Sequence, residues 1–145
     1  MIFYQLQINE LPEKTRESHV NIKSYLIYIV DDDESVRRAL KRLFKSVGLE
    51  VETFASAGEF LNAGHTDSLS CLILDVKMPG ISGLELQERL NAEVTKMPII
   101  FISAYQEKEI SAKAMKAGAK AFLSKPFDDQ TLLDEVYSAL GIESR

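Results

Sequence analysis

The sequence predicts an α/β fold in which a doubly wound, five-stranded parallel sheet lies between two layers of helices, a three-layer α/β/α domain. Four short, mostly apolar runs and one run of alternating polar and apolar residues are interleaved with five segments whose apolar residues recur at helical spacing, and such an order is typical of parallel βαβ units. Four of the runs also end at, or are directly followed by, a charged or hydroxyl-bearing residue, and the carboxyl ends of parallel strands share the edge where ligands bind. The runs are 25–30, 50–54, 71–75, 99–103 and 120–124.

Residues 25–30 predict the first strand, because this run is rich in aromatic and β-branched residues. The helix that follows is amphipathic and ends at Gly48. Its apolar side consists of Val36, Leu40, Leu43 and Val47. Alternating polar and apolar residues in 50–54 then predict the second strand.

Two serine-to-glutamate patterns mark the next two helix starts. Ser56 with Glu59, and later Ser82 with Glu85, have the three-residue spacing of a capping box. Between these two starts lies the run 71–75, which reads Cys-Leu-Ile-Leu-Asp. Because this run carries no charge before its last residue, it predicts a strand that is buried on both faces.

The last third of the chain continues the alternation. Met97-Pro98 breaks the preceding helix, and the apolar run 99–103 predicts the fourth strand. Residues 107–117 predict a helix that stops at the glycine after it. Residues 120–124 predict the fifth strand, and Asp128 is expected to cap the final helix.

Composition and charge argue against several classes of protein. Of the 145 residues, 46% are hydrophobic and 27% are charged, which is ordinary for one globular domain. The net charge of -5 argues against a direct nucleic-acid partner. No apolar run is long enough to span a membrane, and no secretory signal is evident. The single cysteine, Cys71, allows no internal disulfide, so we expect a cytoplasmic protein.

The strand-and-helix pattern covers only part of the chain. Residues 1–24 show no clear period, so we expect an N-terminal extension outside the core fold, flexible or loosely docked. Residues 25–141 form the predicted domain, and 142–145 a short C-terminal tail.

Four strand ends bring complementary chemistry to one edge of the predicted sheet. The residues are Asp31 and Asp32 after the first strand, Asp75 at the end of the third, Ser103 at the end of the fourth and Lys125 after the fifth. Three carboxylates close together repel one another unless a cation joins them. Oxygen ligands that leave room for water suit Mg²⁺, so we expect a magnesium site here.

The same residues suit phosphoryl transfer. An aspartate such as Asp75 can accept a phosphoryl group as an acyl phosphate. Lys125 would supply a positive charge and the Ser103 hydroxyl a hydrogen-bond donor, and phosphoryl transfer depends mostly on positioning and charge neutralisation. The alternative is that each residue is an incidental polar group at a strand end, since aspartate is common there. Complementary residues at four strand ends favour the functional interpretation.

Several short motifs occur together and in order along the chain. They are Val30-Asp31-Asp32-Asp33, Leu74-Asp75 with Met78-Pro79-Gly80 and Gly83, Ile102-Ser103-Ala104, Lys116-Ala117-Gly118-Ala119 and Lys125-Pro126-Phe127. With these motifs, residues 24–140 resemble the response-regulator receiver domain of two-component signalling, in the CheY-like superfamily. The resemblance implies a flavodoxin-like sheet and a phosphorelay function.

The resemblance also implies a role for each acidic residue. Asp75 would be the phosphoacceptor. Asp32, Asp75 and the backbone carbonyl of Lys77 would ligate Mg²⁺, while Asp31 would act through a metal-bound water.

A second implied group of residues would switch the domain between two states. Ser103 would be the switch hydroxyl and Phe122 the switch aromatic, exposed at rest and buried after phosphorylation. Lys125 would pair with Asp75 at rest and with the phosphoryl group after transfer. The Lys125-Pro126 bond would be cis, which is inexpensive only before proline.

The implied partner is a sensor histidine kinase or a histidine phosphotransfer protein. The helix after Ser103, the fifth strand and the last helix would form a surface for a second copy of the domain or an effector. The stretches 36–40 and 125–128 resemble receivers that precede LuxR-type DNA-binding domains. We expect no output domain in this chain, which is either a natural single-domain regulator or a shortened form of a longer protein.

Two other classes of protein compete with a signalling phosphoacceptor that is not an enzyme. A hydrolase with an aspartyl-phosphate intermediate usually has a second acid two residues after the nucleophile, where this chain has Lys77. An interaction module that works without phosphorylation would not need the acidic residues together with Ser103 and Lys125. Both alternatives are therefore disfavoured.

Overall fold

The computed structural model describes residues 25–65, 69–93, 97–104 and 107–142. The elements in chain order are β1 (Leu26–Val30), α2 (Glu34–Ser46), β2 (Glu50–Phe54), α3 (Ala57–Ala63), β3 (Ser70–Asp75), α4 (Gly83–Ala92), β4 (Ile99–Ser103), α5 (Lys108–Lys116), β5 (Ala121–Ser124) and α6 (Asp129–Leu140). The predicted extension, residues 1–24, and residues 143–145 of the predicted tail lie outside the described residues.

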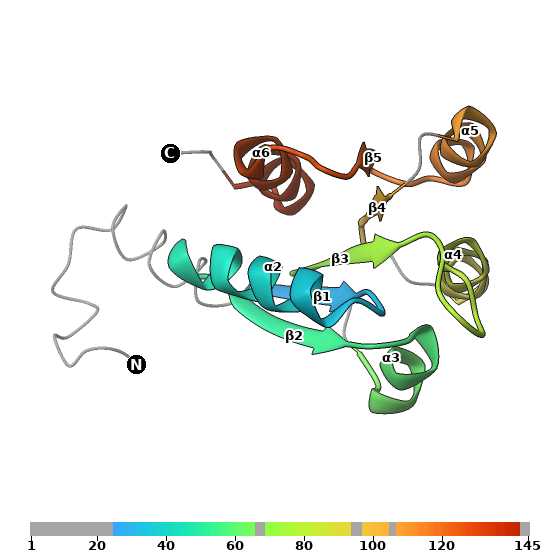
Figure 1. The fold of residues 1–145 in the computed structure, drawn as a ribbon, viewed down its shortest axis with the longest axis horizontal. Helices are drawn as coiled ribbons and strands as arrows, with labels where there is room; N and C mark the ends of the chain where they lie inside the picture. The colour runs from blue at the N-terminus through green and yellow to red at the C-terminus, as the bar shows by residue number, and fades with distance from the viewer. Residues whose placement is uncertain (1–24, 66–68, 94–96, 105–106, 143–145) are drawn as a thin grey trace, which may run out of the picture.

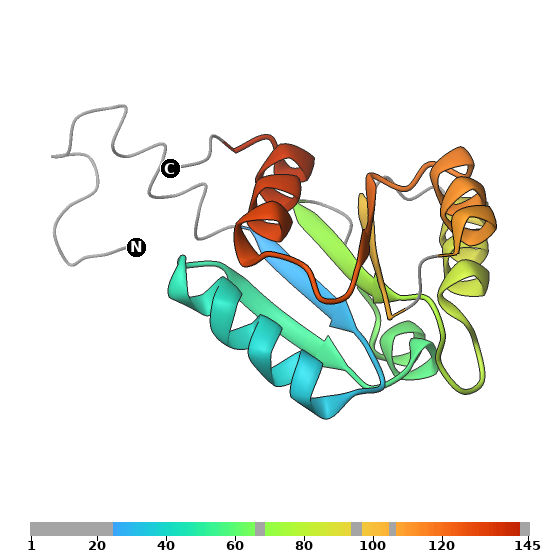
Figure 2. The same ribbon diagram turned by 45° about the horizontal axis from the view of Figure 1, so that its top comes forward.

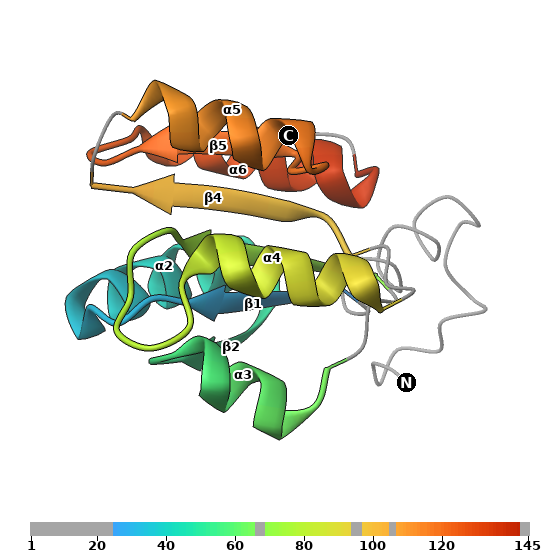
Figure 3. The same cartoon turned by 90° about the vertical axis from the view of Figure 1, so that its right-hand side faces the viewer.

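The five strands form one parallel sheet in the order β2-β1-β3-β4-β5. Helices α2 and α6 cover one face of the sheet, and α3, α4 and α5 cover the other (Figure 1, Figure 2). Figure 3 looks onto the face covered by α3, α4 and α5. The arrangement confirms the predicted doubly wound, three-layer α/β/α fold.

Strand β3 lies at the centre of the fold because apolar residues cover both of its faces. All six of its residues are buried, as the uncharged run predicted. Leu72 and Leu74 pack with α3, α4 and α5, whereas Cys71 and Ile73 pack with α2 and α6. Burial raises the pKa of the Cys71 thiol to about 12, so this cysteine is a core residue without nucleophilic character.

The two predicted capping patterns both mark helix starts. Ser82 and Glu85 form a complete capping box at the start of α4. Ser56 accepts a hydrogen bond from the backbone N–H of Glu59 at 3.1 Å, but the Glu59 carboxylate accepts from the N–H of Ala55 instead of that of Ser56. At the start of α3, the hydrogen bond accepted by the glutamate carboxylate is therefore shifted by one residue relative to a standard capping box.

Two further helices have side-chain caps, and one does not. Asp33 caps α2 by accepting from Ser35, and Asp128 caps α6, as predicted, by accepting from Thr131. The N-cap residue of α5, Glu107, makes no side-chain cap hydrogen bond. Within the described residues, no helix is long and apolar enough to cross a membrane.

One helix ends earlier than its sequence signal indicates. Met97-Pro98 predicts a break in the helix that starts at Ser82, but α4 already ends at Ala92. Glu93 follows in an extended conformation, with φ of -83° and ψ of 154°. The other predicted helix and strand bounds agree with the structure within two residues.

Candidate functional site

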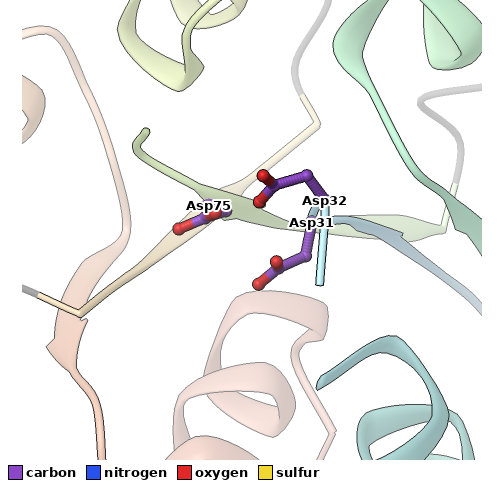
Figure 4. A group of neighbouring side chains, drawn as sticks. All are labelled: Asp31, Asp32 and Asp75. Carbon is purple, nitrogen blue, oxygen red and sulfur yellow. The ribbon is translucent and has the colours of Figure 1, made fainter. Parts of the chain in front are cut away.

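The candidate site lies where the order of the strands reverses. Strand β1 pairs with β2 on one side and with β3 on the other, and ligands of open α/β sheets bind at the carboxyl ends of the strands at such a switch point. Asp31 and Asp32 follow β1, and Asp75 is the last residue of β3, as Figure 4 shows. Carboxylate oxygens of the three residues all lie within 4.8 Å of one another. The structure therefore brings together the three acids that the sequence placed at one edge.

The three carboxylates differ in exposure. Asp31 is completely buried, Asp75 is 6% exposed and Asp32 lies on the surface. The Asp31 carboxylate accepts from the backbone N–H of Asp33 at 2.9 Å, and the Arg37 guanidinium donates to the backbone carbonyl of Asp31 at 2.8 Å. These bonds fix Asp31 at the base of the cluster, with Asp32 facing solvent.

Lys125 supplies the positive charge of the site. Its Nζ lies 3.0 Å from a carboxylate oxygen of Asp31 and 3.7 Å from one of Asp75. The expected pair with Asp75 is therefore present, but Lys125 is closer to Asp31. Burial acts to lower the pKa of Lys125, but the hydrogen bond and charge of Asp31 outweigh it and raise that pKa above its usual value. The Lys125-Pro126 bond is cis, as the resemblance implied.

The pKa of the Asp75 carboxyl group lies well above that of an ordinary aspartate. Burial and the neighbouring charge of Asp31 raise its pKa to about 7, although the charge of Lys125 acts in the opposite direction. The charge of Asp32 adds to the increase. Without a further cation, Asp75 is thus only partly ionised near neutral pH.

The three carboxylates of the cluster repel one another, and this arrangement fits a divalent cation. The donor set contains only carboxylate oxygens, and its exposed member leaves a side open to water. Such a set suits a hard cation, and a bound cation would remove the repulsion that raises the pKa of Asp75. Lys77 lies on the surface in the segment after β3, and the metal-binding role of its backbone carbonyl stays a prediction.

The two expected switch residues lie on neighbouring strands. Ser103 ends β4 and is 3% exposed. Phe122 on β5 is half-buried and stacks on Phe101, with ring centroids 6.0 Å apart. The expectation of an exposed aromatic at rest is therefore only partly met, because one side of the Phe122 ring is packed against the core around Phe101.

Gly83 belongs to one of the quoted motifs, but sequence reasoning assigned it no role of its own. A Cβ atom at this position would collide with the backbone carbonyl oxygen of Asp75 and lie 3.0 Å from the Cα of Val76. The N–H of Gly83 also donates to the carbonyl of Val76 at 2.8 Å. The absence of a side chain thus lets α4 start directly against the end of the strand that carries Asp75.

Gly83→Ala is expected to lower the free energy of unfolding by about 1–3 kcal/mol, because backbone atoms must move to accept the new methyl group. The matched control is Gly58→Ala in α3, where the nearest atom to an added Cβ is the Ser56 Oγ at 3.8 Å. This control should be neutral or stabilising by up to about 1 kcal/mol, through helix propensity. Urea unfolding of both variants measures the difference, and equal stabilities would contradict the close approach.

Comparison with known proteins identifies the family. Residues 27–137 match the response regulator receiver domain. Because this match covers well over half of the chain, the protein belongs to the response regulator receiver family, a family of signalling domains.

Several curated relatives are response regulators. Nodulation protein W of Bradyrhizobium diazoefficiens is 50% identical over 114 residues, which cover 79% of this chain and 50% of that protein. Response regulator protein TodT of Pseudomonas putida is 44% identical over 131 residues, with coverages of 90% and 58%. Transcriptional regulatory protein FixJ of Azorhizobium caulinodans is 42% identical over 119 residues, with coverages of 82% and 56%. The chain thus spans about half the length of the curated relatives it matches.

Solved structures agree with this family. The response regulator StyR superposes with a TM-score of 0.75 at 47% identity, covering 80% of this chain and 59% of that chain. The FixJ-N structure gives a TM-score of 0.73 at 31% identity, covering 84% of this chain and 98% of that chain. In both comparisons the similarity covers at least 80% of this chain.

Proposed function

We propose that this receiver domain accepts a phosphoryl group on Asp75, in a Mg²⁺-dependent reaction, from a sensor histidine kinase or a histidine phosphotransfer protein. One observation supports this proposal above the others. The Nζ of Lys125 lies within 4 Å of carboxylate oxygens of both Asp31 and Asp75, beside the exposed Asp32. A nucleophile, a place for a divalent cation and a fixed positive charge thus occur at one point.

In the proposed transfer, a carboxylate oxygen of Asp75 attacks phosphorus. The bond between phosphorus and the donor breaks, and the donor leaves with the electron pair of that bond. Lys125 neutralises negative charge on the transferred group, and Asp31, which it touches, keeps the ammonium in place. Mg²⁺ held by Asp32 and Asp75, with Asp31 acting through a metal-bound water, would supply further charge neutralisation and favour the ionised form of Asp75.

We propose that phosphorylation changes the surface formed by α5, β5 and α6. Phe122 lies on β5, which is part of this surface. Ser103 ends the neighbouring strand β4. A second copy of the domain or an effector protein would bind there. Direct contact with nucleic acid is not part of the proposal, since the chain is acidic, with a net charge of -5.

The domain would act as a signalling phosphoacceptor that catalyses only its own phosphorylation and dephosphorylation. Position 77, two residues after Asp75, carries an exposed lysine, whereas a hydrolase with an aspartyl-phosphate intermediate usually has an acid there. Location in the cytoplasm, predicted from the cysteine content, belongs to the same proposal.

The first test is the metal dependence of phosphorylation. Incubation with acetyl phosphate and Mg²⁺ should add the mass of one phosphoryl group, and chelation with EDTA should slow this uptake by at least about tenfold, because charge on the transferred group is then poorly neutralised. Intact-mass spectrometry measures the uptake.

Two variants make the metal test specific to the cluster. Asp32→Ala should raise the Mg²⁺ concentration needed for labelling. The neighbouring Asp33→Asn, which removes a charge outside the cluster and still caps α2, should leave that requirement unchanged. Labelling that is equally fast in EDTA would reject the metal dependence.

A further inference from the structure

Every backbone and side-chain polar atom of Asp31 has a hydrogen-bond partner. Its N–H donates to the carbonyl of Phe54 at 3.1 Å, and its two carboxylate oxygens accept from the N–H of Asp33 at 2.9 Å and from the Nζ of Lys125 at 3.0 Å. Its carbonyl oxygen accepts from a guanidinium nitrogen of Arg37 at 2.8 Å. Asp31 therefore cannot turn within the cluster of carboxylates without breaking one of these bonds.

The bond from Arg37 also bears on the position of Asp32. The carbonyl of Asp31 and the N–H of Asp32 belong to one planar peptide unit, so a donor that holds the oxygen also fixes the direction in which the chain enters Asp32. Asp32 is the exposed member of the cluster, so side-chain packing does little to position it. The place of its carboxylate therefore depends on the peptide that precedes it.

Arg37 differs from the other basic residues of α2. It is half-buried, whereas the other four are exposed to solvent. Arg38, the next residue, forms an ion pair with Glu34 on the surface at 3.3 Å. Side chains of a helix lean towards its amino end, so Arg37, at the fourth residue of α2, reaches back to the end of β1. The exposed basic residues are Arg38, Lys41, Arg42 and Lys45.

We propose that Arg37 is a positioning residue of the metal site. Through the carbonyl of Asp31, it holds the peptide before Asp32 in the orientation that keeps the Asp32 carboxylate beside that of Asp75, where the two can bind one divalent cation. This inference rests on the proposed function, which assigns Mg²⁺ to this cluster. Arg37 acts through Asp31 and takes no part in bond making. Groups that orient metal ligands in this way contribute to metal affinity.

The sign of the expected effect separates positioning from charge. Removal of a cation near three carboxylates would by itself favour binding of another cation, so a pure field effect would raise the metal affinity. Loss of a positioning bond lowers the affinity, because the ligands must then be ordered when the metal binds. Arg37→Met keeps an apolar stem and a high helix propensity but has no donor. It should bind the cation about three- to tenfold more weakly, the range that one hydrogen bond supplies.

Two further variants make the test specific to the bond with the Asp31 carbonyl. Arg38→Met is the matched control, because it removes the same guanidinium from the next position and breaks only the surface ion pair with Glu34. It should bind the cation as tightly as the wild type, or slightly more tightly. Arg37→Lys keeps the charge and a donor, on a stem without the fixed geometry of a guanidinium, and should recover part of the lost affinity. An equal loss of affinity in Arg38→Met and Arg37→Met would overturn the inference.

The measurement is binding of Mn²⁺ to each protein without any phosphoryl donor. Mn²⁺ suits the same carboxylate and water ligands as Mg²⁺, and the electron paramagnetic resonance signal of the free ion gives the bound fraction. Displacement of Mn²⁺ by Mg²⁺ then gives the affinity for Mg²⁺. At Mg²⁺ concentrations that saturate each protein, Arg37→Met should take up the phosphoryl group from acetyl phosphate at the wild-type rate, because the bound cation itself then holds Asp32 in place.

Hydrogen exchange tests the positioning without metal. The amide of Asp33, which donates to the Asp31 carboxylate, should exchange faster in Arg37→Met than in Arg38→Met, whereas the amides of β3 should exchange equally in both. Wild-type protein that binds no Mn²⁺ would reject the metal site of the proposed function, and this inference with it. Wild-type protein that binds Mn²⁺, together with equal or tighter binding by Arg37→Met, would reject only the role of Arg37.

Discussion

Asp75→Asn is expected to take up no phosphoryl group from acetyl phosphate and Mg²⁺ under conditions that label the wild type. Asparagine keeps the shape of the side chain but has no anionic oxygen to attack phosphorus. Intact mass after the same incubation measures the difference. Asp128→Asn is the matched control, because it removes an equal charge at an exposed site and still provides a cap for α6. Equal labelling of Asp75→Asn and wild type would show that the phosphoacceptor lies elsewhere.

The same variant has a second expected property, which shows that loss of labelling does not come from misfolding. In the metal-free wild type, the pKa of Asp75 is about 7 in the folded state against 3.8 for an ordinary aspartate. The folded state thus binds more protons than the unfolded state between these values, and stability falls as pH rises through this window. The amide of asparagine does not ionise, so Asp75→Asn should be more stable than wild type above pH ~7, by about 1–2 kcal/mol after allowance for solvent screening. A lower melting temperature than wild type at that pH would contradict the raised pKa.

The fold could be predicted because local and global signals agree in this chain. The uncharged run before Asp75 predicted a strand buried on both faces, and all of β3 is buried. Ser82 and Glu85 predicted a helix start, and they form a complete capping box. The early end of α4 at Ala92 was not predictable, because no glycine or proline marks it. The helix ends there because Glu93 adopts an extended conformation, for which the sequence gives no signal.

The residues of the candidate site were predictable where they follow strands. Parallel strands place their carboxyl ends at one edge, so Asp31, Asp75 and Lys125 could be placed on the same edge of the sheet. Which carboxylate Lys125 approaches more closely was not predictable, because that depends on side-chain packing. A sequence pattern also says nothing about ion pairs such as that of Lys77 with Glu107, which lie 30 residues apart. A charged residue directly before a helix, where a capping side chain is expected, is the only signal that could have drawn attention to Glu107.

The position of Phe122 makes a switch physically reasonable. One side of its ring stacks on Phe101, while the ring also borders a surface hollow between α5 and β5. A half-buried ring beside empty space can pack in more than one way, whereas a fully enclosed ring cannot. A phosphoryl group can shift such a balance only if it makes a contact in one state that it lacks in the other. The Ser103 hydroxyl, on the strand next to Phe122, is the group that we expect to make that contact.

Ser103→Ala should therefore still accept a phosphoryl group on Asp75, yet lose most of the response at the surface of α5, β5 and α6. The lost contact is a hydrogen bond to a charged acceptor, worth about 1.5–3 kcal/mol, so the gain in partner binding or dimerisation on activation should fall by about tenfold or more. The measurement compares binding with and without beryllofluoride, a phosphoryl mimic. Ser124→Ala is the matched control, because Ser124 lies opposite Ser103 at the end of β5 and should leave the gain unchanged. Equal gains in wild type and Ser103→Ala would show that the Ser103 hydroxyl does not carry the signal.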